Sequence, residues 1–562
     1  MTREEGRRTK DEAPKWARLL ERRMDPGLVS LDPAELGLYD RDAAPLPASA
    51  KWAFRPRPDV VVRPVNADQV RKVVRFGAKA GVPVVPRGAA TWGFGGAVPV
   101  NGGIVFDLQG LSGISVDRDT MTVTAGAGAI WRDVADLARR RGFMLPAYPT
   151  SAPGSTVGGW INTGGVGVGA YKYGGIDRQV RAMRVVLPTG ELVRLGFDRV
   201  IPNSSGYDLK SLLIGSEGTL GVVVDATLEL VPAPEEMRPL AAGFPSAKEL
   251  GDFVQILARS RVTPYHISFY DPAHLSNLER LGETVPYGGG LVSMLFEGYS
   301  AVVDWEWEAA AELVRNAGGE VAGDVYAKTT WDEHMFDLRV ARDGPTLLMN
   351  EVFVPLGRTS EVMAGMARII EAHGVPGGIV GTAASRSTAS LMPYALVDGR
   401  QWSSFFAYGL VDEFAQLALD LGGRPAGVGL WMAYQMPDMH GGALDAMKAV
   451  KRALDPKGVM NPGKLVHAVS KYDVRIPAAM MSLGTKSISM VHALLATDGR
   501  SVRRRAPKGA STHGTSEEAD ILEEERVEDL EDARAALEAA EAGIDAEEDP
   551  GTTGTPAGKE EG

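Results

Sequence analysis

Two glycine-rich stretches constrain the fold of this 562-residue chain more than any other feature. The first runs from Pro86 to Gly96 and the second from Pro149 to Gly165, and each is entered from a strand-like run. Small side chains leave successive backbone N–H groups open to an anion, as in phosphate-binding loops. Either stretch alone could be a tight turn that needs glycine for its backbone angles. Two of them, about sixty residues apart, favour an extended ligand that carries phosphate.

The two stretches lie in a region where short β-branched runs alternate with helical patterns. The pattern predicts a helix over Ala67–Ala80, capped by Asn66, and a second helix over Ile130–Arg141. A hairpin is predicted to turn at Thr189–Gly190. Residues Pro149–Gly175 are mostly small, so we expect a loop there and no core element.

A second mixture of helices and strands begins beyond Pro234. Single cores stop growing at roughly 250–300 residues, so a chain of this length needs more than one lobe. We predict one lobe over residues 58–234 and another over residues 235–467. The helices predicted in the later lobe are Ala247–Arg259, Val303–Ala317, Thr359–His373 and Ala443–Leu454. The strands predicted there are residues 290–298, 347–355 and 405–411.

The segments that flank the two lobes are less regular. Residues 1–57 predict an N-terminal arm with a short helix over Trp16–Met24. Residues 468–562 contain a moderately apolar piece, a basic patch and a long acidic stretch that has little to bury. We expect a largely disordered acidic tail, to which a partner subunit could bind.

Composition argues against several classes of function. The formal charge of -12 argues against nucleic-acid binding, which depends on clustered Lys and Arg. With no cysteine, the chain cannot form a disulfide, hold an iron–sulfur cluster or link a flavin through sulfur. The sequence shows no secretory signal and no apolar run of membrane-spanning length. The expected location is the cytoplasm, with peripheral attachment to the inner face of the membrane as an alternative.

The residues Gly165–Ala170, GVGVGA, match the dinucleotide fingerprint Gly-x-Gly-x-x-Gly/Ala in form. That fingerprint works between a hydrophobic strand and a helix, with an acidic ribose partner about twenty residues further on. No such strand, helical pattern or acidic residue accompanies the match here. The sequence therefore argues against a nicotinamide cofactor.

Seven segments in this order resemble one known family: PRGAATWGFGGAVP, GGIVFDLQGLSGI, TVTAGAGAIWRDV, PTSAPGSTVGGWINTGGVGVGAYKYGG, VVLPTGELV, GYDLKSLLIGSEGTLGVV and RALDPKGVMNPGKL. They resemble the FAD-binding fold of the vanillyl-alcohol oxidase and p-cresol methylhydroxylase (PCMH) type. The similarity is greatest to the branch that contains D-lactate dehydrogenases and the glycolate oxidase flavin subunit. Together the segments span most of Pro58–Leu465. The resemblance implies an α+β fold with a two-subdomain FAD-binding lobe and a cap domain, whose antiparallel sheet is covered by helices.

The resemblance also implies that the glycine-rich stretches hold FAD. Residues 86–91 and 151–159 would bind the diphosphate, Asn162 and Gly165 would lie beside the isoalloxazine ring, and residues 217–222 would pass near the ribityl or adenine end. The residues implied in cofactor binding are Pro86, Arg87, Gly88, Ala89, Ala90, Thr91, Pro149, Ser151, Ser155, Thr156, Gly158, Gly159, Asn162, Gly165, Tyr173, Glu217 and Val222. Relatives that bind flavin covalently use a His or Cys in these loops. This chain has neither there, so noncovalent FAD is expected.

In the later lobe, Arg339 precedes a Glu-Val-Phe-Val-Pro motif that begins at Glu351, as in the resembling branch. The resemblance implies that Arg339 grips a substrate carboxylate with paired hydrogen bonds. The branch's histidine motifs for a divalent metal and for a base are missing, so we expect no metal site. Four histidines stand alone and are expected to cap helices or lie at the surface: His266, His274, His334 and His373. The hydroxyl proton of a substrate then needs another acceptor, for which the candidates are Glu351, Arg386, Tyr394 and Tyr434.

The sequence as a whole predicts an FAD-dependent oxidoreductase that acts on a small hydroxylated substrate. A 2-hydroxyacid such as D-lactate or glycolate is the leading substrate, with a quinone, a cytochrome or an electron-transfer protein as electron acceptor. An aryl-alcohol or phenol oxidase and an alkylglycerone-phosphate synthase are alternatives, because GSTVGGW and GVGLWMAY resemble motifs of those enzymes. A further alternative is a scaffold subunit that binds FAD but has lost its base.

Overall fold

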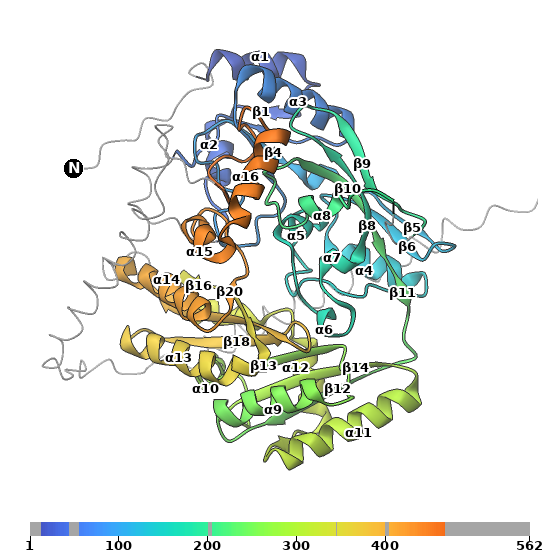
Figure 1. Ribbon diagram of the computed structural model, residues 1–562, viewed down its shortest axis with the longest axis vertical. Coiled ribbons are helices and arrows are strands. Elements are labelled where there is room, and N and C mark those ends of the chain that lie inside the picture. The colour runs from blue at the N-terminus through green and yellow to red at the C-terminus, as the bar shows by residue number, and fades with distance from the viewer. Residues whose placement is uncertain (1–12, 44–54, 201–204, 344–345, 399–403, 467–562) are drawn as a thin grey trace, which may run out of the picture. The chain divides into compact units, whose positions relative to one another are not determined.

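The structure is a computed structural model that describes residues 13–43, 55–200, 205–343, 346–398 and 404–466 (Figure 1). The chain divides into two compact units, Met1–Asp498 and Gly499–Gly562. The second unit lies wholly outside the described residues, and so does the predicted acidic tail. Within the first unit we call residues 55–232 the first lobe, residues 236–425 the second lobe and residues 428–466 the return segment.

The first lobe begins with a small, mainly parallel sheet in the order β1-β2-β4-β3. Both β2 and β3 run parallel to β4, whereas β1 is antiparallel to β2. The strands are β1 (Val29–Ser30), β2 (Val60–Val62), β3 (Val84–Arg87) and β4 (Ile104–Asp107). The crossover between β2 and β3 contains helix α3 (Ala67–Ala80), as predicted.

Helix α3 shows why the sequence folds this way locally. The Asn66 side chain accepts a hydrogen bond from the backbone N–H of Gln69, which satisfies a group that the first turn leaves unpaired. Gly81 ends the helix in the left-handed conformation that glycine adopts most readily. Val70, Val73 and Val74 lie on one face and are fully buried. Each such valine contributes roughly 1.5–3 kcal/mol to folding.

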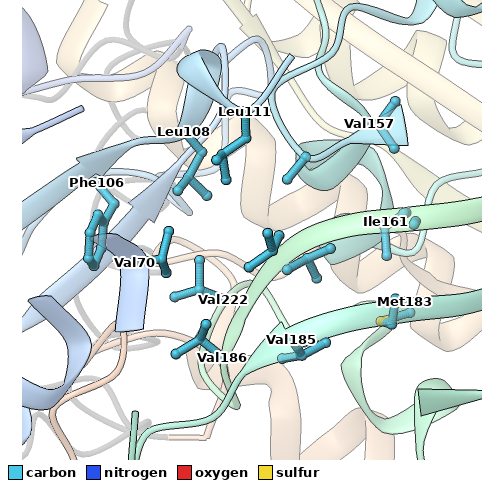
Figure 2. Close-up of a cluster of buried hydrophobic side chains, with 14 of the residues drawn as sticks. Val70, Phe106, Leu108, Leu111, Val157, Ile161, Met183, Val185, Val186 and Val222 are labelled. Atoms are coloured by element: carbon cyan, nitrogen blue, oxygen red, sulfur yellow. The ribbon is translucent and has the colours of Figure 1, made fainter. Parts of the chain in front are cut away.

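An antiparallel sheet in the order β5-β6-β10-β8-β9 completes the first lobe. The strands are β5 (Ile114–Asp117), β6 (Thr122–Gly126), β8 (Val180–Val186), β9 (Leu192–Gly196) and β10 (Val222–Glu229). The hairpin of β8 and β9 turns at Gly190, which confirms the predicted position. Figure 2 shows the core of this lobe, where side chains from α3, β4, β8 and β10 meet.

The glycine-rich residues Pro149–Gly175 were predicted to form a loop, and that prediction is wrong in part. They contain helices α5 (Val157–Thr163) and α6 (Ala170–Tyr173). Val157 and Ile161 are four residues apart and share one helix face, which is fully buried in the core (Figure 2). Small residues around this pair weaken the periodic pattern, so the sequence conceals the helix.

The second lobe is built on a sheet of nine strands in the order β15-β12-β14-β13-β18-β19-β17-β20, with β16 also paired to β19. Every pairing in this sheet is antiparallel. The strands are β12 (Glu236–Gly243), β13 (His266–Tyr270), β14 (Leu291–Gly298), β15 (Glu320–Val321), β16 (Thr346–Met349), β17 (Val352–Pro355), β18 (Gly377–Ala383), β19 (Thr388–Val397) and β20 (Arg424–Pro425).

Helices cover both faces of this sheet. One face packs against α9 (Ala247–Arg259), α11 (Ser300–Asn316), α13 (Thr359–Ala372) and α14 (Ser404–Asp420). The other face packs against α10 (Pro272–Arg280), α12 (Asp324–Asp332) and the 3-10 helix η5 (Asp337–Asp343). Neighbouring residues of β12 show the alternation, since Leu240 joins the first core and Ala241 the second.

Two predictions for the second lobe need correction. Residues 405–411, predicted as a strand, lie in helix α14, because their apolar run continues a much longer helix. Residues 347–355 form two strands and not one, because the chain breaks at Asn350 and Glu351. The predicted helices over Ala247–Arg259 and Ala443–Leu454 are confirmed. Helix α11 begins three residues earlier than predicted, at Ser300.

The return segment brings the chain back to the first lobe (Figure 1). It contains α15 (Met436–His440) and α16 (Ala443–Leu454). The backbone N–H of Val84 in β3 donates to the carbonyl of Val459, and the carbonyl of Val84 accepts from Asn461. The ammonium of Lys464 is buried and donates to the carbonyl of Val98 at 2.8 Å. The first lobe is thus completed by residues from the far end of the described chain.

The remaining short elements connect these layers. Near the N-terminus they are α1 (Lys15–Arg23), where a helix was predicted over Trp16–Met24, and α2 (Pro33–Leu36). In the first lobe they are α4 (Trp131–Arg140), β7 (Phe143–Met144), α7 (Ile176–Gln179), α8 (Lys210–Leu213) and β11 (Val231–Pro232). No helix in the described part of the chain is long and apolar enough to cross a membrane.

Candidate functional site

A cavity of about 530 Å³ is lined by residues of both lobes. The first lobe contributes mainly loop residues with small side chains, and the second contributes charged, polar and apolar side chains. Lining residues from the first lobe include Pro86, Arg87, Gly88, Ala89, Ala90, Thr91, Trp92, Pro149, Ser151, Ser155, Thr156, Gly158, Gly159, Asn162, Gly165 and Glu217. Lining residues from the second lobe include Phe336, Asp337, Arg339, Arg342, Met349, Glu351, Phe353, Thr382, Ser390 and Met392.

The two glycine-rich loops touch each other at the floor of this cavity. A Cβ atom on Gly88 would collide with the Thr156 side chain, so only glycine fits there. Thr156 caps helix α5, where its hydroxyl accepts a hydrogen bond from the backbone N–H of Gly159 at 3.3 Å. A Cβ atom on Gly158 would come within 2.7 Å of the Cβ atom of Ala127. Both loops therefore pack closely against their neighbours, and residues of both line the cavity.

Two buried polar atoms among the lining residues have no hydrogen-bond partner in the described part of the chain. They are the hydroxyl of Ser155 and one carboxylate oxygen, Oε2, of Glu217. The other oxygen of Glu217 accepts a hydrogen bond from the backbone N–H of Gly429 in the return segment at 2.9 Å. Burial raises the pKa of Glu217. Buried polar atoms are almost always paired, so these two atoms point to a polar ligand in the cavity.

Asn162 joins the second glycine-rich loop to the Glu217 turn. Its amide donates to the carbonyl of Gly158 at 2.8 Å, and its oxygen accepts from the backbone N–H of Gly218 at 3.1 Å. Asn461 of the return segment donates to the carbonyl of Gly96 at 2.9 Å and also to the carbonyl of Glu217. These amides hold three separate segments in one cradle.

Arg339 lines the cavity, but its guanidinium is already engaged. It pairs with both carboxylate oxygens of Glu283, and its Nη2 lies 2.9 Å from a carboxylate oxygen of Glu333. Its side chain is only 15% exposed. A guanidinium held by two carboxylates has little hydrogen-bonding capacity left for a third. These ion pairs therefore disfavour the predicted contact between Arg339 and a substrate carboxylate.

Arg342 lies one helical turn beyond Arg339 in η5 and is exposed. It lines the same cavity, and no ion pair or hydrogen bond of its side chain is found among the described residues. The sequence analysis did not single it out. No sequence motif marks this position, because Arg342 differs from Arg339 only in the side chains that the fold places beside it.

Glu351 also lines the cavity, as a candidate base should. Its carboxylate accepts a hydrogen bond from the Ser390 hydroxyl at 2.9 Å and interacts with the indole of Trp92 from the first lobe. Burial raises the pKa of Glu351, and these two partners oppose that rise.

Five other predicted site residues lie outside the lining of the cavity. Tyr394 is fully buried, with its hydroxyl bonded to His274 and Asn277. Tyr434 bonds to Asp412, and Arg386 donates to backbone carbonyls, including that of Ser260. Tyr173 donates to Glu297 at 2.8 Å, and Val222 is buried in β10. The structure gives each of these residues a packing or hydrogen-bonding role away from the cavity.

The four histidines were expected to cap helices or lie at the surface; all four are buried, and His373 is the C-cap residue of α13. His266 and His334 lie together, with ring centroids 6.5 Å apart, and Trp331 stacks on His334. Burial lowers the pKa of His266 to about 3, which keeps it neutral. The only sequence signal for the burial of His266 is the apolar strand pattern around it. One histidine within such a pattern does not reveal that its side chain is buried.

Asp337 is the residue of the cavity that sequence reasoning missed most clearly. It begins η5 and lines the cavity. Its carboxylate accepts a hydrogen bond from the hydroxyl of Tyr270 at 2.9 Å. Burial raises the pKa of Asp337 to about 7. Three apolar neighbours, Met335, Phe336 and Leu338, were the available hint that this carboxylate is not a surface charge.

Comparisons with known proteins agree with the geometry. Residues 58–196 match the family model described as FAD binding domain, and residues 233–465 match FAD linked oxidases, C-terminal domain. The D-lactate dehydrogenase of Archaeoglobus fulgidus is 32% identical over 416 residues, which cover 72% of this chain and 91% of that protein. The glycolate oxidase subunit GlcD of Bacillus subtilis is 28% identical, over 76% of this chain and 92% of that protein.

Among solved structures, p-cresol methylhydroxylase with substrate bound has a TM-score of 0.70 at 17% identity, over 82% of this chain and 97% of that one. This likeness confirms the PCMH-type α+β fold. The lobes and their shared cavity define a flavin-dependent oxidoreductase that acts on CH–OH donors, with FAD as its cofactor. The chain belongs to the family of FAD-linked oxidases.

The described residues fit this cofactor. Gly88 leaves no room for a side chain between the loops, Gly158 packs directly against Ala127, and the unpaired polar atoms of Ser155 and Glu217 belong to residues that line the same cavity. In the described ranges no group of three His, Cys, Asp or Glu side chains could hold a metal ion.

Proposed function

We propose that this enzyme dehydrogenates a small 2-hydroxyacid, such as D-lactate or glycolate, to the corresponding 2-oxoacid. The observation that carries the proposal is Arg342, an exposed guanidinium without a partner among the described residues, at the lining of the cavity. A carboxylate binds such a group through two parallel charge-assisted hydrogen bonds. The names of the relatives in Archaeoglobus fulgidus and Bacillus subtilis, a D-lactate dehydrogenase and a glycolate oxidase subunit, support the same substrate class.

The cofactor contacts remain those that the resemblance implies. Residues 86–91 and 151–159 would hold the diphosphate against backbone N–H groups, and Asn162 and Gly165 would lie beside the isoalloxazine ring. Glu217 would serve the ribityl or adenine end with its unpaired oxygen. Bound FAD would accept a hydride from the substrate carbon.

We also propose that FAD is held without a covalent bond. The chain has no cysteine, and neither a histidine nor a tyrosine is found among the described residues that line the cavity. Acid precipitation of the purified enzyme should leave all flavin in the supernatant. Flavin that remains with the precipitated protein would contradict this part of the proposal.

The residues of the second lobe bind and orient the substrate. Arg342 would take the carboxylate, while Arg339, fixed by Glu283 and Glu333, keeps η5 in place at the lining of the cavity. Apolar side chains of Phe336, Met349 and Met392 would exclude water from the reacting carbon. Orientation of this kind accounts for a large part of the acceleration in such enzymes.

Anaerobic mixing with candidate substrates tests the proposal directly. D-lactate or glycolate should bleach the flavin within seconds, whereas vanillyl alcohol should leave it oxidised. Fast reduction by the aromatic alcohol alone would favour an aryl-alcohol or phenol oxidase. Reduction by neither, combined with activity on an acylated dihydroxyacetone phosphate, would favour an alkylglycerone-phosphate synthase. A yellow protein that no substrate reduces would favour a scaffold subunit.

The electron acceptor and the partners are proposed on the resemblance alone. We propose that a quinone, a cytochrome or an electron-transfer protein reoxidises the flavin, in the cytoplasm or at the inner face of the membrane. The acidic tail, residues 468–562, would bind a partner subunit there. Steady-state rates with a quinone analogue, cytochrome c and oxygen, each with and without the tail, would identify the acceptor and the contribution of the tail.

A further inference from the structure

We propose that Asp337 is the base that accepts the hydroxyl proton of the substrate, and that Tyr270 is the positioning residue that fixes its carboxylate. This inference rests on the proposed function and supplies the group that the missing histidine motifs leave vacant. No histidine is found among the described residues that line the cavity, so the proton must go elsewhere.

The first argument is geometric. Asp337 opens η5, the same short helix that carries Arg342 to the lining of the cavity. A substrate whose carboxylate is held by Arg342 therefore occupies the cavity that Asp337 also lines. Its hydroxyl is one carbon away from its carboxylate, and the inference requires this hydroxyl to come within hydrogen-bond reach of Asp337.

The second argument is the way in which the Asp337 carboxylate is held. Oδ1 accepts the Tyr270 hydroxyl at 2.9 Å, and Tyr270 is itself buried in β13. The Ser268 hydroxyl lies 3.3 Å from the Tyr270 hydroxyl, and the ring of His274 in α10 stacks on the Tyr270 ring at 5.3 Å. Asp337 has no second hydrogen-bond partner among the described residues, so Oδ2 is available to a substrate.

Glu351 is the competing carboxylate, and its surroundings suit it less well. It is held by the Ser390 hydroxyl and by the Trp92 indole, which come from different lobes. These two donors stabilise the carboxylate in place and link β19 to the first glycine-rich loop. Glu351 therefore fits a structural bridge across the cavity, whereas Asp337 fits a group that exchanges a proton.

The charged and titratable groups around Asp337 come from three elements. Arg339 and Arg342 belong to its own helix, Tyr270 comes from β13, and His274 comes from α10. Burial raises the pKa of Asp337 to about 7, while the Tyr270 hydroxyl and the charge of Arg339 oppose the rise. His274 is buried, which lowers its pKa to about 3, so it stays neutral beside Tyr270. A base with this pKa is partly ionised at neutral pH and can both take and release a proton.

The reaction balances with these groups. The O–H bond of the substrate breaks and its proton moves to Oδ2 of Asp337, while the C–H bond breaks and hydride passes to FAD as the oxidant. The carbon–oxygen double bond of the 2-oxoacid forms from the O–H electron pair. The proton on Asp337 then leaves to water through the cavity once the product departs.

The test compares four variants of the full-length holoenzyme: Asp337→Asn, Tyr270→Phe, Glu351→Gln and Asp332→Asn. Asp332 is an exposed residue of α12 and serves as the matched control. Two quantities are measured from pH 5 to about pH 9: the rate of anaerobic flavin reduction by D-lactate or glycolate, and the affinity for oxalate, followed by calorimetry. Oxalate carries two carboxylates but no hydroxyl proton, so its binding reports on the site without the reaction.

We expect Asp337→Asn to keep its flavin and its affinity for oxalate, and to be reduced about 10²–10⁴-fold more slowly than the wild type. The wild-type rate should rise with pH around 7, and this dependence should vanish in Asp337→Asn. In Tyr270→Phe the rise should move to higher pH, because the hydrogen bond that favours the carboxylate is lost. The Asp332→Asn variant should match the wild type.

Three results would overturn the inference. An Asp337→Asn variant reduced as fast as the wild type would exclude Asp337 as the base. Loss of oxalate binding together with the rate would make Asp337 a structural residue. If Tyr270→Phe leaves the pH dependence unmoved while Glu351→Gln abolishes it, the base is Glu351. A wild type that no 2-hydroxyacid reduces would instead refute the proposed function itself, and the inference would fall with it.

Discussion

The two lobes line the same cavity with different chemical groups. The first lobe offers backbone: its loops approach so closely at Gly88 and Thr156 that no side chain fits between them. The second lobe offers charged side chains, among them Asp337, Arg342 and Glu351. A backbone surface suits a ligand that every family member shares, because backbone N–H groups are present whatever the sequence. A side-chain surface can change with the substrate.

This difference gives each lobe its own sensitivity to substitution. In the first lobe, added bulk should be far more damaging than the loss of any single side chain. In the second lobe, the loss of one charge should be damaging to the reaction while leaving the flavin bound. The following variants test that contrast.

The largest effect is expected from Gly88→Val. The new side chain collides with Thr156, so the two loops must separate and the cradle opens. Overpacking of this kind costs about 1–3 kcal/mol or more, and FAD affinity should fall at least about tenfold to a hundredfold. The ratio of flavin to protein absorbance after purification measures the effect. Gly113→Ala is the control, because nothing lies within 4 Å of its added carbon, and full flavin content in Gly88→Val would contradict the backbone argument.

Arg342→Leu should lower kcat/KM for the 2-hydroxyacid about 100-fold while the flavin content stays unchanged. A hydrogen-bonded contact with a charged group is worth about 1.5–3 kcal/mol, which is lost when the guanidinium is removed. Steady-state kinetics measure this, with Arg342→Lys expected to recover part of the loss. Arg358→Leu, at an exposed ion pair with Glu361, is the matched control. An unchanged KM in Arg342→Leu would place the substrate carboxylate elsewhere.

Asp271→Asn should make the folding stability of the second lobe less dependent on pH. Asp271 caps α10 and accepts hydrogen bonds from His274 and Ile379 through one oxygen, which asparagine can reproduce. Burial raises the pKa of Asp271 from 3.8 to about 6. The native state thus holds more protons than the unfolded state between these values, and wild-type stability falls as pH rises from about 4 to about 6.

The Asn variant lacks this pH-dependent loss of stability, so its advantage over the wild type should grow across that window to about 3 kcal/mol. Urea titrations of both proteins at about pH 4, 5, 6 and 7 would measure the difference in their free energies of unfolding. A constant difference at every pH would show that Asp271 titrates with its ordinary pKa.

The smallest effect is expected from Ser155→Ala in the first lobe. The buried hydroxyl has no partner among the described residues, and one hydrogen bond to the FAD diphosphate is worth about 0.5–1.5 kcal/mol. FAD affinity should therefore fall by a factor of about 2–10, which fluorescence titration of the apoprotein would resolve. Ser112→Ala, at an exposed position outside the cavity, should leave the affinity for FAD unchanged. A loss of FAD affinity as large as that in Gly88→Val would contradict the proposed contrast between the two lobes.

The first lobe was the easier part to predict from sequence. Its helix over Ala67–Ala80 follows from a strong apolar period with a cap at each end, and its glycine loops stand out because only glycine tolerates such close backbone contact. The helix at Val157–Thr163 was not predicted, because its glycines lower the helix propensity of the segment. In the folded protein, the packing of Val157 and Ile161 in the core outweighs this low propensity.

The chemistry of the second lobe was harder, because it depends on residues far apart in the chain. Tyr270 precedes Asp337 by 67 residues, and no local pattern links them. Tyr394 was a reasonable candidate by residue type, yet its hydroxyl faces His274 and Asn277 in the core. Arg339 and Arg342 look alike in sequence, and only the fold shows that two glutamates pair with Arg339 while Arg342 has no partner among the described residues.

The return segment has a consequence for how the enzyme is made. Val459 and Asn461 bond to Val84 in β3, and the Asn461 side chain reaches both Gly96 and Glu217 at the cofactor cradle. A ribosome synthesises those residues hundreds of positions after the glycine loops they complete. We therefore expect the cradle of the nascent first lobe to stay incomplete until the second lobe has been synthesised, and the flavin to bind stably only after the return segment has emerged.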